Sequence, residues 1–206
     1  MEVPLRLGEL APSHRDRLAE ILRGTGAFSD DEVLVGIELF DAAFGDASHT
    51  TRGDVAARGR VEGDQHPALP RQPTADELSP DPDYSFLGAF TPENELVGYA
   101  CYGPTPGTDR VYDLYWIAVH AAAHGAGIGT AILTEVERRL QQRQARMLVA
   151  ETSSRSDYAA TRDFYGRRGY AESARVREFY APGDDRIIFT KRFQHSPDGG
   201  EHSHHE

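Results

Sequence analysis

The chain has 206 residues, a length that suits one domain with at most a tail. Hydrophobic residues make up 39% and glycine adds 20 residues, a globular proportion that excludes a wholly disordered protein. Lysine and arginine number 22 against 33 aspartates and glutamates, which gives a net charge of −11. This charge argues against nucleic acid or an anionic membrane as the main partner and favours a cationic one, such as an amine.

Cysteine content and hydropathy exclude further classes. A single cysteine, Cys101, excludes an internal disulfide framework or a Cys-rich zinc site. No apolar run approaches the roughly 20 residues that span a bilayer. The first residues, MEVPLRLGEL, do not resemble a signal peptide. We therefore expect a cytoplasmic protein that binds no metal.

The N-terminal part predicts a short strand and two helices. Residues 4–10 carry leucines two positions apart, as strands do. Ser13 is expected to cap a first helix that ends near Arg23, and Ser29 and Glu32 form a capping box for a second. Apolar residues at helical spacing mark the inner face of the second helix: Val33, Ile37, Phe40 and Phe44.

Residues 45–83 are polar, irregular and rich in Gly, Pro, Asp and Arg. The segment is too long for an ordinary connector, so it is either an insertion that forms a lid over a site or plain disorder. The polar, His-rich residues 195–206 are expected to form a disordered tail. The predicted domain is therefore 1–194, with 45–83 as an insertion.

The remaining chain alternates strands and helices. Strands at 84–91 and 96–102 form a hairpin, and the aromatic run VYDLYWIAV at 111–119 is a third strand. A glycine-rich segment then opens a helix. Further elements follow in the order helix to Leu140, strand 147–150, helix 158–168, and strands 174–180 and 186–193. The order β-α-α-β-β-β-α-β-α-β-β predicts a three-layer α/β fold, in which helices cover both faces of a mixed sheet.

The segment HGAGIGT opens the third predicted helix with glycines at 125, 127 and 129. A helix N-terminus has unpaired N–H groups and a partial positive charge, so it suits phosphate, and glycine lets the backbone approach the anion closely. The glycine spacing does not fit the dinucleotide pattern G-x-G-x-x-G, and no lysine follows as in a P-loop. A glycine-rich turn without a ligand is the alternative.

Two segments together resemble the signatures of the GNAT acetyltransferase superfamily, in its bacterial small-molecule type. In the first, a strand ends at Val119, His124 stands where Gln or Arg is usual, and Gly127 and Gly129 take the glycine positions. The second, TRDFYGRRGYAE, resembles A-x-x-F-Y-x-x-x-G-F, with Phe164, Tyr165, Gly169 and Tyr170 in place. The resemblance covers about residues 4–193 apart from the insertion, and it implies a GNAT-like fold with a mostly antiparallel sheet.

The resemblance implies an N-acetyltransferase that uses acetyl-CoA as cosubstrate and transfers the acetyl group directly to a primary amine of a small molecule. Loop amides would hold the CoA pyrophosphate, and an N–H at the strand end would meet the thioester oxygen. The acetyl-CoA-binding residues implied are Ile117, Ala118, Val119, His124, Gly125, Ala126, Gly127, Ile128, Gly129 and Thr130. Arg167 and Arg168 either reach the CoA phosphates or lie on a solvated face. A homodimer would be typical of the family.

The acid and base roles fall on three residues. By resemblance, Tyr165 protonates the departing thiolate, although the same side chain could simply pack its helix onto the sheet. An alkyl ammonium with a pKa near ~10 has to lose a proton before it attacks, so a base is also needed. Asp113 is one candidate, because strand alternation places it on one face with Tyr115 and Ile117, and a carboxylate in an apolar strand is costly unless it is functional or paired. Glu151, at the carboxyl end of a strand, is the second.

Alternatives remain open for both carboxylates and for the function. Asp113 or Glu151 could pair with an arginine or be merely exposed, and a water chain could act as the base. The protein could also acetylate a protein amine, bind CoA as a non-catalytic regulatory module, or be an unrelated nucleotide-binding α/β domain. Asp184 and Asp185 suit a tight turn, and they could also meet a cationic substrate.

Overall fold

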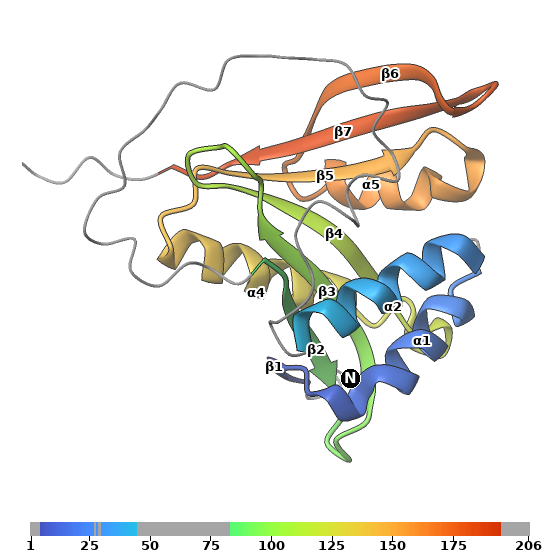
Figure 1. Cartoon of the computed structure of the whole chain (residues 1–206), viewed down its shortest axis with the longest axis vertical. Helices are drawn as coiled ribbons and strands as arrows, with labels where there is room; N and C mark the ends of the chain where they lie inside the picture. The colour runs from blue at the N-terminus through green and yellow to red at the C-terminus, as the bar shows by residue number, and fades with distance from the viewer. Residues whose placement is uncertain (1–4, 27, 29, 45–82, 195–206) are drawn as a thin grey trace, which may run out of the picture.

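The computed structural model describes residues 5–26, 28, 30–44 and 83–194 (Figure 1). The chain begins with strand β1 (Arg6–Glu9), a 3-10 turn at Pro12–His14, and helices α1 (Arg15–Gly24) and α2 (Asp30–Phe44). The predicted cap at Ser13 is wrong, because Ser13 lies within the 3-10 turn and α1 follows His14 without a side-chain cap. The predicted cap Ser29, the insertion 45–82 and the tail 195–206 lie outside the described residues.

Seven strands form one sheet in the order β1-β2-β3-β4-β5-β7-β6. Neighbouring strands are antiparallel throughout, except for the parallel pair β4 and β5. The mixed, mostly antiparallel sheet predicted above is therefore confirmed. The remaining strands are β2 (Ser85–Phe90), β3 (Leu96–Pro104), β4 (Val111–Val119), β5 (Met147–Ser153), β6 (Ala171–Ala181) and β7 (Asp184–Arg192).

Helices cover the two faces of the sheet in pairs. Helices α4 (Ile128–Gln142) and α5 (Ala159–Gly166) pack on one face, where the apolar stripe of α4 is fully buried. Helices α1 and α2 pack on the other face, over a second apolar cluster. The predicted inner face of α2 is buried at three positions, whereas Phe44 is partly exposed. Each buried aliphatic side chain contributes about 1.5–3 kcal/mol, so these two clusters hold the three layers together.

A bulge in β4 changes which residues share a face. On β3, Cys101 pairs with Trp116 and Tyr102 pairs with Leu114, so Tyr115 is an extra residue on β4. Beyond it the alternation is reversed: Tyr115 packs on the α1–α2 side, whereas Ile117 packs on the α4–α5 side. Of the three residues predicted to share one face, Asp113 and Tyr115 do so, and the prediction is wrong for Ile117.

The central strands separate beyond this bulge. The β4–β5 ladder runs from Val111 and Met147 to Leu114 and Ala150 and ends there. Strand β4 continues along β3 to its end, and β5 continues along β7 to Ser153. The sheet is thus split at the carboxyl ends of its two parallel strands, and the diverging ribbons are visible in Figure 1. Carboxyl ends of parallel strands are the usual place for a ligand.

Candidate active site

Backbone N–H groups of β4 face the split. The His120 N–H donates to the Val97 carbonyl on the β3 side at 2.8 Å. Because successive N–H groups of a strand point in opposite directions, Ala118 also faces β3, whereas Ile117 and Val119 face the side where β5 has diverged. Of the three predicted strand-end residues, the structure therefore turns the N–H groups of Ile117 and Val119 toward the split.

The loop after β4 is shaped by glycines and by His124. The ring Nε2 of His124 donates to the Val119 carbonyl oxygen at 2.8 Å, and this bond folds the loop back on the end of β4. Gly125 and Gly127 then adopt φ angles of 79° and 78°, a left-handed conformation that costs other residues about 1–2 kcal/mol. The signature that this loop resembles usually has Gln or Arg at the position of His124. Here the Nε2 of His124 is bound to the backbone and is not free to meet a ligand.

Helix α4 begins at Ile128 with an open N-terminus. Gly127 is its N-cap and provides no side-chain acceptor, and the first N–H within the helix to find a partner is that of Ala131, which donates to Gly127 at 3.0 Å. The N–H groups of the first helical residues have no partner within a helix, so this end offers donors and the positive end of the helix dipole. The predicted loop residues, from His124 through Ala126 to Thr130, thus lie at this open helix end, after the end of β4.

Tyr165 lies on the α5 side of the sheet. Its ring is buried between Tyr170 and Phe189, with centroids 5.3 and 5.6 Å away, and it also contacts Phe164. Among the described residues its hydroxyl has no hydrogen-bond partner. Burial raises the pKa of this phenol well above its usual value, so Tyr165 stays protonated at neutral pH.

Asp113 and Glu151 lie on the opposite side of the sheet. Asp113 is in register with Val149, and Glu151 is two residues further along β5, so the two carboxylates share a face. Burial raises the pKa of Asp113, and the charge of Glu151 adds to the effect, whereas Arg186 opposes it. Glu151 accepts a hydrogen bond from Arg186, whose guanidinium lies 4.8 Å from the ring centroid of Phe179.

Two tyrosines and a further acid lie near Glu151, and no pattern in the sequence indicated them. Burial, together with the charge of Glu32 at the start of α2, raises the pKa of Tyr158 to about 12. Burial and the charge of Glu151 raise the pKa of Tyr180. These side chains come from α2, the turn before α5 and the β6–β7 hairpin, so no spacing within one segment could reveal them.

Thr152 is another residue that the sequence analysis missed. It follows the end of the β4–β5 ladder and points to the same side as Leu148 and Ala150, toward α4 and α5. Its Oγ1 is buried without a hydrogen-bond partner among the described residues. The one signal in the sequence is a hydroxyl residue directly after the apolar run MLVA and Glu151.

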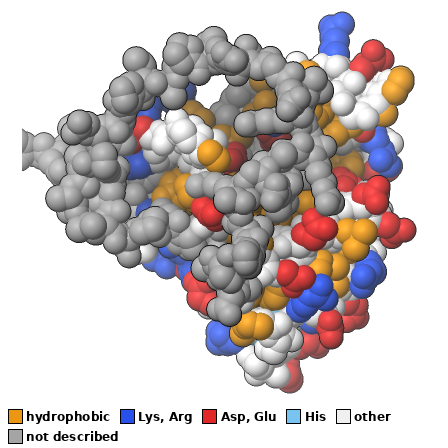
Figure 2. All heavy atoms as spheres, in the orientation of Figure 1, with side chains coloured by type: hydrophobic (Ala, Val, Ile, Leu, Met, Phe, Trp, Pro, Cys, Tyr) orange, Lys and Arg blue, Asp and Glu red, His pale blue; other side chains and the backbone are white. Residues whose placement is uncertain are grey.

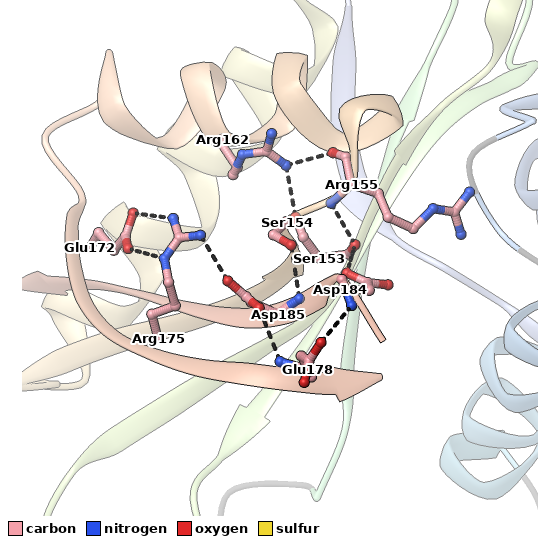
Figure 3. Close-up of polar contacts among 10 residues, drawn as sticks. Ser153, Ser154, Arg155, Arg162, Glu172, Arg175, Glu178, Asp184 and Asp185 are labelled. Carbon is pink, nitrogen blue, oxygen red and sulfur yellow. Dashed lines mark hydrogen bonds and ion pairs between the residues drawn. The ribbon is translucent and has the colours of Figure 1, made fainter. Parts of the chain in front are cut away.

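The loop after β5 is fixed to the start of β7 by a polar network (Figure 3). The Ser153 hydroxyl donates to the buried carboxylate of Asp184 and accepts from the Arg155 N–H at 3.0 Å. Arg162 of α5 donates to the carbonyl oxygens of Ser153 and Arg155, both at 2.8 Å. Asp184 therefore holds the loop that leads from β5 to α5.

Asp185 is equally occupied (Figure 3). Its oxygens accept from the Glu178 N–H at 3.0 Å and from Arg175 at 3.1 Å, and its own N–H donates to the Ser154 hydroxyl at 2.8 Å. Partners within the protein thus bind both carboxylates of the turn, Asp184 and Asp185, and they shape the hairpin beside the split.

The described part of the chain contains no metal-binding cluster, no membrane-spanning helix and no cysteine suited to act as a nucleophile. Within residues 5–26, 28, 30–44 and 83–194, no group of three His, Cys, Asp or Glu side chains could hold a metal ion. No helix in the same residues is long and apolar enough to span a membrane. Cys101 is buried, and burial raises the pKa of its thiol, which does not suit a nucleophile.

Comparison with solved structures places this fold among acetyltransferases. An acetyltransferase of the GNAT family from Desulfovibrio desulfuricans is 33% identical, with a TM-score of 0.70 over 92% of this chain and 99% of the other. Two more distant structures share the fold. The ribosomal-protein-S18-alanine N-acetyltransferase of Escherichia coli is 14% identical (TM-score 0.59, 95% and 98% covered), and an aminoglycoside 6'-N-acetyltransferase complexed with coenzyme A is 16% identical (TM-score 0.59, 94% and 99% covered).

A search of curated proteins gives no match. The sequence model of the acetyltransferase (GNAT) family matches residues 55–170, which is more than half of the chain. The predicted family, fold and enzyme class are confirmed, and an unrelated nucleotide-binding domain is excluded. The protein belongs to the GNAT family of acetyl-CoA-using acetyltransferases and is an N-acetyltransferase.

Proposed function

We propose that the protein transfers the acetyl group of acetyl-CoA directly to a primary amine of a small molecule, within a ternary complex at the split between β4 and β5. One observation carries this proposal. A protonated, buried phenol and a pair of carboxylates lie on opposite sides of the sheet at the point where its ladder ends. A thioester entering from the α4–α5 side and an amine arriving from the other side would meet there.

Acetyl-CoA is held by backbone groups in this proposal. The open N-terminus of α4, behind Gly125 and Gly127, binds the pyrophosphate. The N–H groups of Ile117 and Val119 receive the thioester oxygen as it gains negative charge, an arrangement that lowers the barrier because the donors are already oriented. No metal ion takes part.

Asp113 is the favoured base. A carboxylate with a raised pKa binds a proton more readily, and burial raises the pKa of Asp113, whereas Glu151 is already paired with Arg186. Asp113, directly or through a water molecule, takes the proton of the incoming ammonium. The amine nitrogen then forms the C–N bond, the C–S bond breaks, and Tyr165 gives its proton to the thiolate. The proton that leaves the new amide nitrogen restores the phenol through solvent.

The surface around the carboxylates supports a cationic acceptor. Helix α2 begins with Asp30, Asp31 and Glu32. The charge of Glu32 acts on Tyr158 and Tyr180, and the charge of Glu151 also acts on Tyr180, so these groups lie near one another. Figure 2 shows acidic side chains recurring over the α1–α2 region, with basic ones among them. Acids and aromatic rings together suit an alkyl ammonium.

A protein amine is the second candidate acceptor. The E. coli structure with the same fold is named for acetylation of an alanine in ribosomal protein S18, and the aminoglycoside enzyme is named for a small molecule. A non-catalytic CoA-binding module is the third possibility. Tyr165 and the loop glycines favour catalysis over it, since such a module would have no use for the phenol.

The experiment is an acceptor panel assayed by release of the free CoA thiol from acetyl-CoA. The panel contains amino acids, polyamines and aminoglycosides, with N-terminal alanine peptides as the protein-amine arm. We expect release to depend on a small amine, and acetyl-CoA alone to raise the melting temperature of the protein. Release with peptides alone would transfer the assignment to protein acetylation. Stabilisation by acetyl-CoA without release from any acceptor would favour the regulatory module.

A further inference from the structure

A partly buried arginine lies beside the open N-terminus of α4. Arg168 follows α5, and its Nη2 donates to the Oγ1 of Thr130 in the first turn of α4. Its Nη1 donates to the Phe164 carbonyl oxygen at 3.0 Å, and its guanidinium carbon lies 3.7 Å from the centroid of the Phe164 ring. The cation is therefore fixed at the end of α4 where the unpaired N–H groups are found.

The Phe164 ring lies against the first turn of α4, next to Gly129. A Cβ at Gly129 would lie 3.4 Å from the Phe164 ring, an ordinary van der Waals distance, so the ring lies directly beside the helix end. Phe164 thus carries the guanidinium on its ring at this end of α4. An arginine stacked on an aromatic ring loses less freedom when it binds an anion, because its planar group is already oriented.

No carboxylate in the described part of the chain is paired with this cation. Among the described residues, Arg168 forms no ion pair, and its Nε is buried without a partner. Glu137 is the acid whose charge acts on it, but Glu137 binds Lys191 at 2.6 Å and Tyr170 at 2.9 Å. Burial and the neighbouring charge of Arg167 lower the pKa of Arg168, as expected for a guanidinium that lacks an anion.

The loop itself lacks a comparable charge. His124 replaces the Gln or Arg usual in this family, and its Nε2 is engaged with the Val119 carbonyl. The whole chain has a net charge of −11, which repels an anionic cosubstrate. We propose that Arg168 binds a phosphate group of the acetyl-CoA held at the N-terminus of α4 and supplies the cationic contact that the loop lacks. This inference rests on the proposed use of acetyl-CoA.

The test measures the Kd of coenzyme A by calorimetry for wild type, Arg168→Gln and Arg168→Lys, at two salt concentrations. Arg167→Gln is the matched control, because Arg167 is the exposed neighbour with the same charge and only a 4.0 Å contact to Asp163. A lost charge-assisted hydrogen bond predicts binding about 10- to 100-fold weaker for Arg168→Gln and less than about twofold weaker for Arg167→Gln. Binding by Arg168→Gln should also depend less on salt.

Dephospho-CoA locates the contact. If Arg168→Gln binds dephospho-CoA as well as wild type does, the 3′-phosphate is the partner, whereas an equal loss with both ligands assigns the pyrophosphate. Binding of coenzyme A within twofold of wild type would overturn the inference, as would weaker binding with an unchanged salt dependence, since that pattern indicates a purely structural role. Failure of wild type to bind coenzyme A would instead refute the proposed function.

Discussion

Replacing Tyr165 by phenylalanine removes the proposed acid with almost no change in packing. The ring is held by Phe164, Tyr170 and Phe189, and all three contacts survive the substitution. The lost hydroxyl makes no hydrogen bond with any described residue, so the free energy of unfolding should change by less than about 1 kcal/mol. A general acid contributes about 10²- to 10⁴-fold to the rate, so kcat should fall by this factor.

The assay is steady-state release of CoA with the best amine of the panel, at saturating acceptor. The KM for acetyl-CoA should change little, since the phenol acts on the leaving thiolate in the transition state and not on the bound cosubstrate. A kcat within about threefold of wild type would refute the acid role and leave the ring as a packing residue.

Tyr170→Phe is the matched control. This ring lies 5.3 Å from that of Tyr165, but its hydroxyl donates to Glu137 at 2.9 Å. Loss of a hydrogen bond to a charged group should lower the free energy of unfolding by about 1.5 kcal/mol and leave kcat unchanged. Equal losses of kcat in both variants would show that the effect of Tyr165→Phe comes from the surrounding packing.

Three further substitutions test other parts of the account. Burial raises the pKa of the Asp113 carboxyl from its usual 3.8, so the native state holds the carboxyl proton more tightly than the unfolded state does. The contribution of Asp113 to stability therefore falls as pH rises and the carboxyl ionises. As pH rises from about 3 to about 7, the melting temperature of Asp113→Asn should therefore fall less, or rise more, than that of wild type. The variant should also lack the acidic limb of the pH profile of kcat/KM. An unchanged limb would exclude Asp113 as the base. Gly127→Ala places a side chain on a residue with a φ of 78°, so the free energy of unfolding in urea should fall by about 1–2 kcal/mol. Coenzyme A should also bind more weakly. The control is Gly166→Ala, which has open space around its Cβ and should lose no stability. Tyr99→Phe removes a buried hydroxyl that has no hydrogen-bond partner among the described residues, so the free energy of unfolding should rise by up to about 1 kcal/mol. A clear loss of stability would mean that this hydroxyl does form a hydrogen bond.

Most of the fold follows from local patterns in the sequence. The two apolar runs at 84–91 and 96–102 predicted a hairpin that the structure confirms. The spacing of Val33, Ile37 and Phe40 predicted a helix that is also confirmed, because a helix buried on one face repeats its apolar residues at a fixed period. The observed start of a helix differs from the predicted one where the choice of capping residue determines it. Ser13 has the right residue type for a cap, yet a 3-10 turn extends past it and α1 begins at Arg15. The strand predicted at 147–150 extends to Ser153 through pairing with β7, which a local window cannot detect.

The candidate site was less accessible to sequence reasoning. Its loop and Tyr165 belong to short motifs, so their positions could be expected. The bulge at Tyr115, in contrast, reversed the face assigned to Ile117. The Glu151–Arg186 pair joins residues far apart in sequence, as does the contact of Arg168 with Thr130. Such contacts depend on how strands and helices pack, and no spacing within one segment encodes them.

Mass spectrometry distinguishes direct acetyl transfer from transfer through an acetylated protein. The protein is mixed with acetyl-CoA, first alone and then with an amine that supports CoA release, and both the intact protein and the products are weighed by mass spectrometry. We expect an unchanged protein mass in both samples and equal amounts of CoA and acetylated amine in the second. A protein that gains an acetyl group and passes it to the amine, or CoA released without any acetylated amine, would contradict direct transfer.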